Sequence, residues 1–300
     1  MFDKKTNAFL IIVFLLSIIS SIIFYFAGGV LGSPIGFVFA IFFMFTPLIS
    51  VLIVEKMIYK ESIRDRLFIS FNMNKWFIVA WLIPVVLVLL TLVISLLFPG
   101  VSYSPGMEGM FERFGSIMSA EELDEMRAAI DALPINPIWI VLFQGLIAGI
   151  TVNAIAGFGE EIGWRGFLVR QFMGMSFVKA SLIIGFVWGL WHAPMILMGH
   201  NYPSYPLVGV LMMILWCILL SPMFLYIMVK AKSVIAASVL HGTLNAIGGL
   251  SIMMVVGGNE LIVGITGISG FIALIIVTLA LFYYDRYVSK EKLMSSVLEV

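Results

Sequence analysis

Long apolar segments separated by short charged ones dominate this sequence of 300 residues. The first runs from Ala8 to Ala27, about twenty residues, which is enough for a helix to cross the ~30 Å hydrocarbon core of a bilayer. Further segments begin near residues 35, 76, 138, 180, 207, 233 and 261. Because hydrophobic residues make up 62% of the chain and charged residues only 11%, a soluble globular domain is excluded. The sequence predicts an all-α, polytopic membrane bundle of about eight transmembrane helices, formed as one domain by residues 1–300.

The distribution of basic residues predicts the topology of this bundle. With the N-terminus in the cytoplasm, the inside segments hold fifteen of the seventeen Lys and Arg residues. Those in the second-to-third loop are Lys56, Lys60, Arg64, Arg66 and Lys75. The outside segments hold only Arg113 and Arg127. This asymmetry follows the positive-inside rule, so we expect both termini in the cytoplasm and the protein in a bacterial-type plasma membrane.

The longest polar segment, 99–137, is expected on the outer side of the membrane. Ser119 followed by Glu122 has the spacing of a helix capping box, and Ala120 to Leu133 has an amphipathic period. The segment is therefore interpreted as an extracytoplasmic loop with a surface helix that caps the membrane face. At the other end of the chain, the charged tail 285–300 is also expected to be helical. The single cysteine, Cys217, excludes an intramolecular disulfide and a cysteine-based metal site.

Two adjacent carboxylates, Glu160 and Glu161, stand at the end of the fourth apolar segment. Arg165 follows Glu161 by one helical turn, so the two side chains can pair on one helix face. An ionisable group inside a bilayer costs about 2.5–3.5 kcal/mol on insertion scales, which makes it a candidate functional group. The alternative interpretation is that these charges only mark the end of a helix at the membrane interface.

Two of the three histidines also lie inside apolar segments. His192 is one turn after Trp188, and His241 is one turn before Asn245. Because residues four apart share a helix face, three helices could direct these side chains into one interior pocket. Alternatively, either histidine could bond a backbone carbonyl, and the pair on the last of these helices could join two helices by a hydrogen bond worth under about 1–2 kcal/mol. The third histidine, in the turn 199–206, is interpreted as a surface residue.

Such a pocket contains the groups that hydrolysis of a peptide bond requires. A carboxylate can hold and deprotonate a water molecule, and a histidine, with an unperturbed pKa of about 6.5, can share that role. An Asn amide and a histidine N–H can donate to an oxygen on which negative charge develops. Two histidines and a glutamate are also a workable set of zinc ligands, with one position left for water. These residues leave the metal-dependent and the metal-free alternatives open.

The three motifs, in this order, resemble those of the CAAX-protease and bacteriocin-processing family. This family, also called CPBP or Abi, comprises intramembrane proteases related to the eukaryotic CAAX prenyl endopeptidase Rce1. The motifs are Glu160-Glu161-x-x-x-Arg165, Trp188-x-x-x-His192 and His241-x-x-x-Asn245. They define a core of about 138–250. The family's second motif usually begins with Phe, where this chain has Trp188, which keeps an aromatic side chain at that position.

The resemblance implies an intramembrane endopeptidase with the site residues Glu160, Glu161, Arg165, His192, His241 and Asn245. In this pattern the first glutamate activates the water with help from the first histidine. The second histidine and the asparagine stabilise the oxyanion, and the second glutamate pairs with the arginine. If a zinc ion takes part, its ligands would be Glu160, His192 and His241. These three can meet only if the fourth helix begins outside the lipid, tilts, or continues past Arg165.

The implied substrate is a membrane-associated peptide or protein, which could be a lipidated C-terminal peptide, a membrane-anchored precursor or a bacteriocin-like peptide. Membrane lipid is the other expected partner. The alternative function is a non-proteolytic adaptor or a bacteriocin-immunity protein, roles to which family members are linked. A transporter that uses the same Glu and His residues is disfavoured because no repeat of the span pattern is evident. The net charge of zero gives no sign of a nucleic-acid partner, and nothing in the sequence indicates an oligomeric state.

Overall fold

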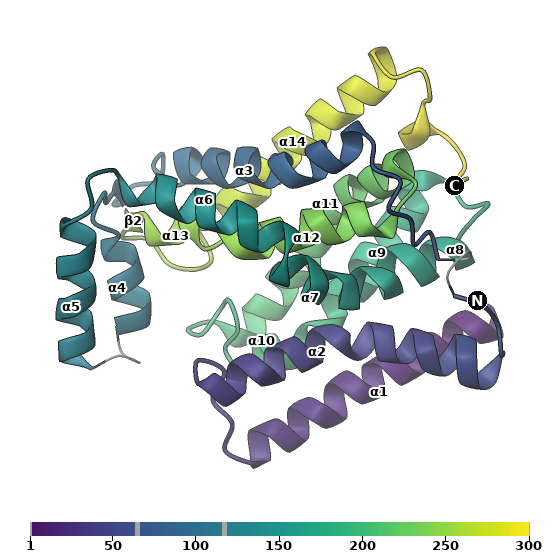
Figure 1. Ribbon diagram of the computed structural model, residues 1–300, viewed down its shortest axis with the longest axis horizontal. Coiled ribbons are helices and arrows are strands. Elements are labelled where there is room, and N and C mark those ends of the chain that lie inside the picture. Colours follow the sequence, from purple (N-terminus) through teal and green to yellow (C-terminus); the bar gives the residue numbers. More distant parts are fainter. Residues whose placement is uncertain (1, 64–66, 116–118, 300) are drawn as a thin grey trace.

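The computed structural model describes residues 2–63, 67–115 and 119–299, so Arg64 and Arg66, two of the predicted inside charges, lie outside the described residues. Long helices packed side by side form the body of the protein (Figure 1). The long helices are α1 (Lys4–Phe26), α2 (Pro34–Leu52), α3 (Lys75–Ser95), α6 (Pro137–Ile150), α7 (Val152–Glu161), α9 (Phe177–Trp191), α11 (Pro206–Ala231), α12 (Val234–Ile247) and α14 (Ile268–Tyr287). The shorter elements are α4 (Glu108–Phe114), α5 (Ala120–Asp131), α8 (Val169–Gln171), α10 (Ala193–Leu197), α13 (Leu250–Met253), β1 (Ser102–Tyr103) and β2 (Val255–Val256).

The prediction of about eight transmembrane helices is confirmed. Among the described residues, seven helical segments are long and apolar enough to cross a membrane, and the bent pair formed by Pro137–Ile150 and Val152–Gln171 makes an eighth if it is counted as one span. Many large apolar side chains on these helices are exposed, such as Ile23 and Phe26 on α1. In a bilayer these side chains face lipid, so the chain is an integral, multi-pass membrane protein.

Short polar side chains fix where most of these helices begin. Each accepts a hydrogen bond from a backbone N–H of the first turn, which has no partner within the helix. These capping residues are Asp3, Ser33, Asn74, Ser119, Asn136, Ser176 and Ser233. Proline follows the cap in α2 and α6, at a position where its missing N–H leaves no bond unmade.

Both termini lie at one end of the bundle, and α4 and α5 lie at the opposite end (Figure 1). Helix α5 begins with the predicted capping box: the Ser119 hydroxyl accepts from Glu122 N–H, and the Glu122 carboxylate accepts from Ser119 N–H. The Ser119 backbone N–H and hydroxyl hold the pKa of Glu122 below its ordinary value. Arg127 of α5 bonds Glu108 of α4 at 2.7 Å. The location of α4 and α5 outside the cytoplasm stays a prediction.

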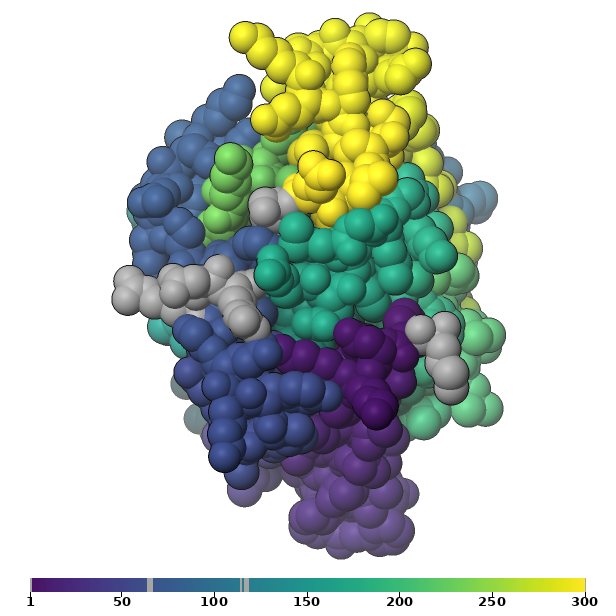
Figure 2. All heavy atoms as spheres, turned by 90° about the vertical axis from the view of Figure 1, so that its right-hand side faces the viewer, coloured from purple at the N-terminus to yellow at the C-terminus, as the bar shows by residue number. Residues whose placement is uncertain are grey.

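The C-terminal part of the chain differs from the prediction in two ways. The last long helix begins at Ile268 rather than near residue 261, because turns with left-handed glycines, among them Gly257 and Gly264, occupy the preceding residues. The tail after α14 is not helical, apart from one 3₁₀ turn at Leu293–Ser295. The buried Asp285 carboxylate accepts from the backbone N–H groups of residues 293 and 294. Residues 296–298 then bond the backbone of residues 174–177, and Figure 2 shows the yellow tail against the teal segment.

Close helix contacts at small residues bring the site-bearing helices together. A Cβ built on Gly242 of α12 would lie 2.4 Å from backbone atoms of Ala154 and Gly149, so α12 touches the backbone of α6 and α7 directly. A Cβ on Gly189 of α9 would lie 2.5 Å from the Cα of Ile214 in α11. Small residues allow this approach between transmembrane helices. As a result, α7, α9, α11 and α12 meet in the centre of the bundle.

Candidate active site

The helix that carries the two glutamates is bent and continues well beyond them. Its two halves, α6 and α7, meet at Thr151 with a bend of 52°. From Glu161 the chain continues through a π-helical stretch, Ile162–Leu168, into α8, which ends at Gln171. Of the three arrangements that would let the site residues meet, the structure has a helix that continues past Arg165. The glutamates therefore do not mark a helix end, and a π-helical turn is often found at functional sites.

Glu161 and Arg165 form a buried ion pair. Neither side chain is exposed, and the Nη1 of Arg165 lies 3.2 Å from the Glu161 carboxylate. The guanidinium lies between two aromatic rings, 4.4 Å from the Trp188 centroid and 4.6 Å from that of Phe224. Its Nη2 donates to the Ser221 hydroxyl at 3.4 Å. A buried charge needs a partner and favourable dipoles of this kind. The topology analysis counted Arg165 among the charges of the cytoplasmic segments. In the structure its side chain is buried in the interior of the helix bundle.

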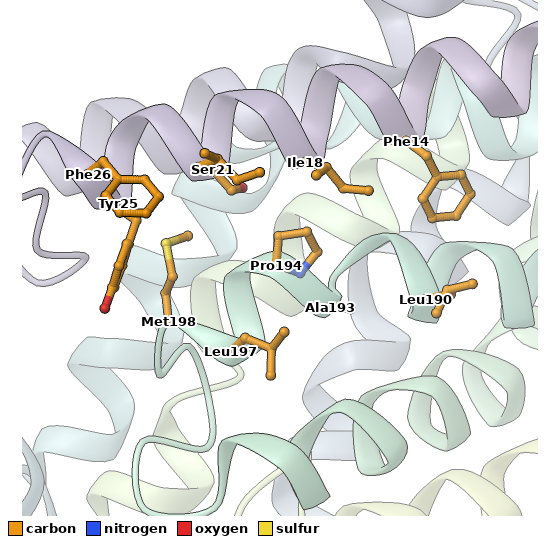
Figure 3. Close-up of a pocket in the computed structure, with 11 residues that line it drawn as sticks. Phe14, Ile18, Ser21, Tyr25, Phe26, Leu190, Ala193, Pro194, Leu197 and Met198 are labelled. Carbon is orange, nitrogen blue, oxygen red and sulfur yellow. The ribbon is translucent and has the colours of Figure 1, made fainter.

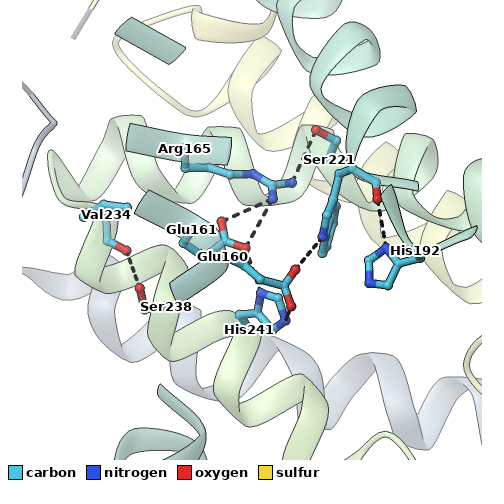
Figure 4. Close-up of polar contacts among 9 residues, drawn as sticks. Glu160, Glu161, Arg165, His192, Ser221, Val234, Ser238 and His241 are labelled. Atoms are coloured by element: carbon cyan, nitrogen blue, oxygen red, sulfur yellow. Dashed lines mark hydrogen bonds and ion pairs between the residues drawn. The ribbon is translucent and has the colours of Figure 1, made fainter. Parts of the chain in front are cut away.

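His241 connects the two glutamates. Its Nδ1 lies 2.7 Å from Oε1 of Glu161, and its Nε2 lies 3.8 Å from Oε1 of Glu160. Glu160 is 2% exposed and His241 is 4% exposed. Because an ionised carboxylate only accepts hydrogen bonds, Nδ1 is the donor to Glu161, and Nε2 faces Glu160. Figure 4 shows the resulting sequence of groups from Arg165 through Glu161 and His241 to Glu160.

Helix α9 adds the second motif to this cluster. The Trp188 indole N–H donates to Oε2 of Glu160 at 2.7 Å. One turn later, His192 Nδ1 lies 2.8 Å from the Trp188 carbonyl oxygen. That carbonyl can only accept, so Nδ1 carries the proton and Nε2 is left without one in the neutral ring. His192 does bond a backbone carbonyl, as its structural interpretation supposed, and the same bond fixes which ring nitrogen is available for chemistry.

The last predicted residue, Asn245, lies one turn beyond His241 on α12 and is exposed. His192 is partly exposed, so these two predicted side chains are accessible, whereas the two glutamates are buried. His200 is exposed in its turn, as expected for a surface residue. Sequence reasoning missed the contributions of α11, where Ser221 and Phe224 contact the guanidinium. No motif in α11 marks these residues, and only the tertiary packing brings them to the site.

Residues 134–247 match the sequence model of a family described as type II CAAX prenyl endopeptidase Rce1-like. Over this segment, the chain is similar to the Rce1-like family. All six predicted site residues lie inside the matched segment. A stretch of 44 residues is also 41% identical to "CAAX prenyl protease 2" from Methanococcus maripaludis. This match covers 14% of the chain and 16% of that relative, so the chain spans only a small part of the curated relative it matches.

The predicted zinc ligands are only partly assembled. Each histidine has its Nδ1 bonded to an oxygen, which leaves Nε2 as the ring nitrogen that could bind a metal, as in many zinc sites. However, among the described residues no three His, Cys, Asp or Glu side chains are placed to hold one metal ion. Glu160 and His241 lie together, and His192 does not complete a three-ligand set with them. The described residues thus do not assemble the predicted three-ligand set, and the zinc centre stays a prediction.

An apolar cavity of about 640 Å³ lies between α1 and the α9–α10 segment (Figure 3). Its walls include Leu190, Ala193 and Pro194, which stand on either side of His192 in the sequence. Among its other lining residues, Ser21 and Tyr25 carry hydroxyl groups. None of the charged site residues lines the cavity, so it is an apolar space next to the polar cluster and separate from it.

Proposed function

We propose that this protein is an intramembrane endopeptidase that cleaves a membrane-associated peptide or protein with a water molecule activated by Glu160. The family match supports a CAAX-type endopeptidase at the level of the family. The observation that carries the mechanism is the buried pair of Glu160 and His241, with 3.8 Å between Oε1 and Nε2. An ionisable pair inside an apolar bundle is costly and is a candidate for chemistry.

In the proposed reaction, Glu160 takes a proton from the water as the water oxygen attacks the carbonyl carbon of the substrate. This step forms a tetrahedral intermediate with a negatively charged oxygen. The proton then passes from Glu160 to the amide nitrogen as the C–N bond breaks, which releases a carboxylate-bearing product and an amine. His192, with its Nε2 free, helps to hold the water. No covalent bond to the protein forms.

Helix α12 supplies the groups that face the developing negative charge. His241, which donates from Nδ1 to Glu161, can also donate from Nε2 when the ring carries both protons. Asn245 extends the same helix face by one turn and is accessible. Preorganised donors of this type stabilise an oxyanion most effectively where water is excluded. The ion pair of Glu161 and Arg165 keeps the His241 ring in position.

Zinc as an activator of the water is a separate proposal that the arrangement of side chains does not favour. Metal analysis of the purified protein tests it directly. One zinc ion per chain, lost in His192→Ala, would establish a metal centre. A metal-free preparation with full activity would refute it.

The experiment that tests the proposed function compares peptide termini in membranes from cells with the wild type and cells with Glu160→Gln. The substitution keeps the size of the side chain and removes the base. Glu291→Gln is the matched control, because Glu291 is 70% exposed at the tail. We expect new termini with the wild type and the control, and none with Glu160→Gln at equal protein levels.

The same comparison distinguishes the alternative function. Identical termini in all three strains, together with a cellular phenotype that Glu160→Gln retains, would refute proteolysis. The protein would then be an adaptor or an immunity protein that binds without cleavage. New termini that depend on Glu160 would also identify the substrate and show whether it is a lipidated C-terminal peptide, a membrane-anchored precursor or a bacteriocin-like peptide.

A further inference from the structure

Trp188 contacts more of the site than the sequence motif indicates. Its indole N–H donates to Glu160 Oε2 at 2.7 Å, and its ring lies over the Arg165 guanidinium. Its backbone oxygen accepts from His192, and its ring centroid is 5.7 Å from that of His241. One side chain and its carbonyl therefore reach the catalytic carboxylate, the buried cation and both histidines.

The two oxygens of Glu160 have different surroundings. Oε2 accepts the indole N–H, whereas Oε1 faces His241 Nε2 at 3.8 Å, which is too long for a direct hydrogen bond. Oε1 is therefore the oxygen with free capacity to accept. We infer that Trp188 is a positioning residue that holds Glu160 by Oε2, so that Oε1 is the oxygen that receives the proton of the attacking water. This inference rests on the proposed function.

The indole is held firmly enough for this role. Trp188 is 1% exposed, and its ring packs against Phe224 and Trp216, with centroid distances of 5.4 and 6.2 Å. A phenylalanine, which is usual at this point of the family motif, could pack against the guanidinium in the same way. It has no N–H, however, and could not hold a carboxylate oxygen. The tryptophan thus adds a donor that the usual residue lacks.

A first test needs no substrate. The chain has seven tryptophans, and selective ¹⁵N labelling of tryptophan in detergent micelles reports each indole N–H by nuclear magnetic resonance. A hydrogen bond to a carboxylate is charge-assisted and stronger than one to a neutral group. Glu160→Gln should therefore shift one indole resonance strongly, whereas the exposed control Glu291→Gln should shift none. If Glu160→Gln leaves every indole resonance in place, the contact is absent and the inference is wrong.

The second test is kinetic and uses the substrate peptide that the comparison of termini identifies. Trp188→Phe removes the donor and keeps an aromatic ring, and Trp139→Phe is the matched control because Trp139 is 62% exposed. We expect kcat to fall about ten- to a hundredfold in Trp188→Phe, the value of a lost hydrogen bond to a charged group. KM should change less than about twofold, and Trp139→Phe should behave as the wild type.

The outcomes separate the inference from the proposed function. Unchanged kcat in Trp188→Phe, a rise in KM alone, or an equal loss in Trp139→Phe would overturn the positioning role while cleavage itself stands. Continued cleavage by Glu160→Gln would overturn the proposed function, whatever the resonances show. If Trp188→Phe does not fold, the resonance test on Glu160→Gln decides, because it leaves Trp188 in place.

Discussion

Replacing Arg165 by methionine tests how the charges are held inside the bundle. Its guanidinium lies 3.2 Å from the Glu161 carboxylate, and neither side chain is exposed. At an effective dielectric constant of about 20, two unit charges at this separation attract by about 5 kcal/mol. The cost of removing each ion from water is several kcal/mol, so the intact pair contributes little net stability. The loss of Arg165 alone is different, because it leaves a buried carboxylate with His241 as its remaining partner.

We therefore expect Arg165→Met to lower the free energy of unfolding by about 3–5 kcal/mol. Reversible unfolding in mixed detergent micelles measures this change. Arg127→Met is the matched control: its ion pair with Glu108 has side chains 43% and 45% exposed, so its loss should cost about 0–1 kcal/mol. The double variant Arg165→Met with Glu161→Gln removes both charges and should recover part of the loss. An Arg165→Met protein as stable as the control, or a double variant less stable than the single one, would refute the pairing argument.

Three further substitutions test other parts of the structure. Asn245→Ala should change the free energy of unfolding by less than about 0.5 kcal/mol, because the side chain is exposed. It should lower kcat by about 10²- to 10³-fold, because a donor to the oxyanion is lost. A loss of stability without a loss of rate would contradict this prediction. Gly242→Ala should destabilise the protein by about 1–3 kcal/mol, since the added Cβ meets backbone atoms at 2.4 Å, whereas Gly106→Ala, in open space apart from one side-chain atom at 3.8 Å, should be tolerated in the same unfolding assay. Asp285→Ala should free the tail and speed its cleavage by an added protease, and an unchanged cleavage rate would show that the backbone pairing of residues 296–298 suffices.

The sequence predicted those features of the fold that depend on local chemistry. Apolar length determines which helices span the membrane, and capping residues such as Ser119 and Ser233 determine where helices begin. The bend at Thr151 and the π-helical stretch after Glu161 were not predictable in this way. No proline lies between residues 138 and 171 to mark a kink. The helix bends where α12 approaches the backbone of α6 and α7, and no local pattern reports that approach.

For the site, the sequence predicted contacts between residues on one helix but not contacts between helices. Spacing correctly paired Glu161 with Arg165 and placed His192 one turn from Trp188. The pattern did not show that His241 would bond Glu161 while facing Glu160, since that contact joins α7 to α12 across about eighty residues. The pattern also predicted a helical tail, which is wrong. A charged segment has the same sequence pattern whether it forms a free helix or pairs with another part of the chain. In the structure, the tail instead uses its backbone to bond the segment 174–177.

Two neighbouring glutamates can have different roles here because they point in different directions. Adjacent residues on a helix are rotated by about 100° from each other. Glu160 accordingly faces α9 and the Trp188 indole, while Glu161 faces Arg165 and His241. Two buried, ionised carboxylates need nearly two positive charges to balance them. Arg165 supplies one permanently, and His241 can supply the second only while it holds both protons. The net charge of the cluster therefore depends on the protonation of His241. The same ring is proposed to face the oxyanion, so one residue determines both the buried charge and the stabilisation of the intermediate.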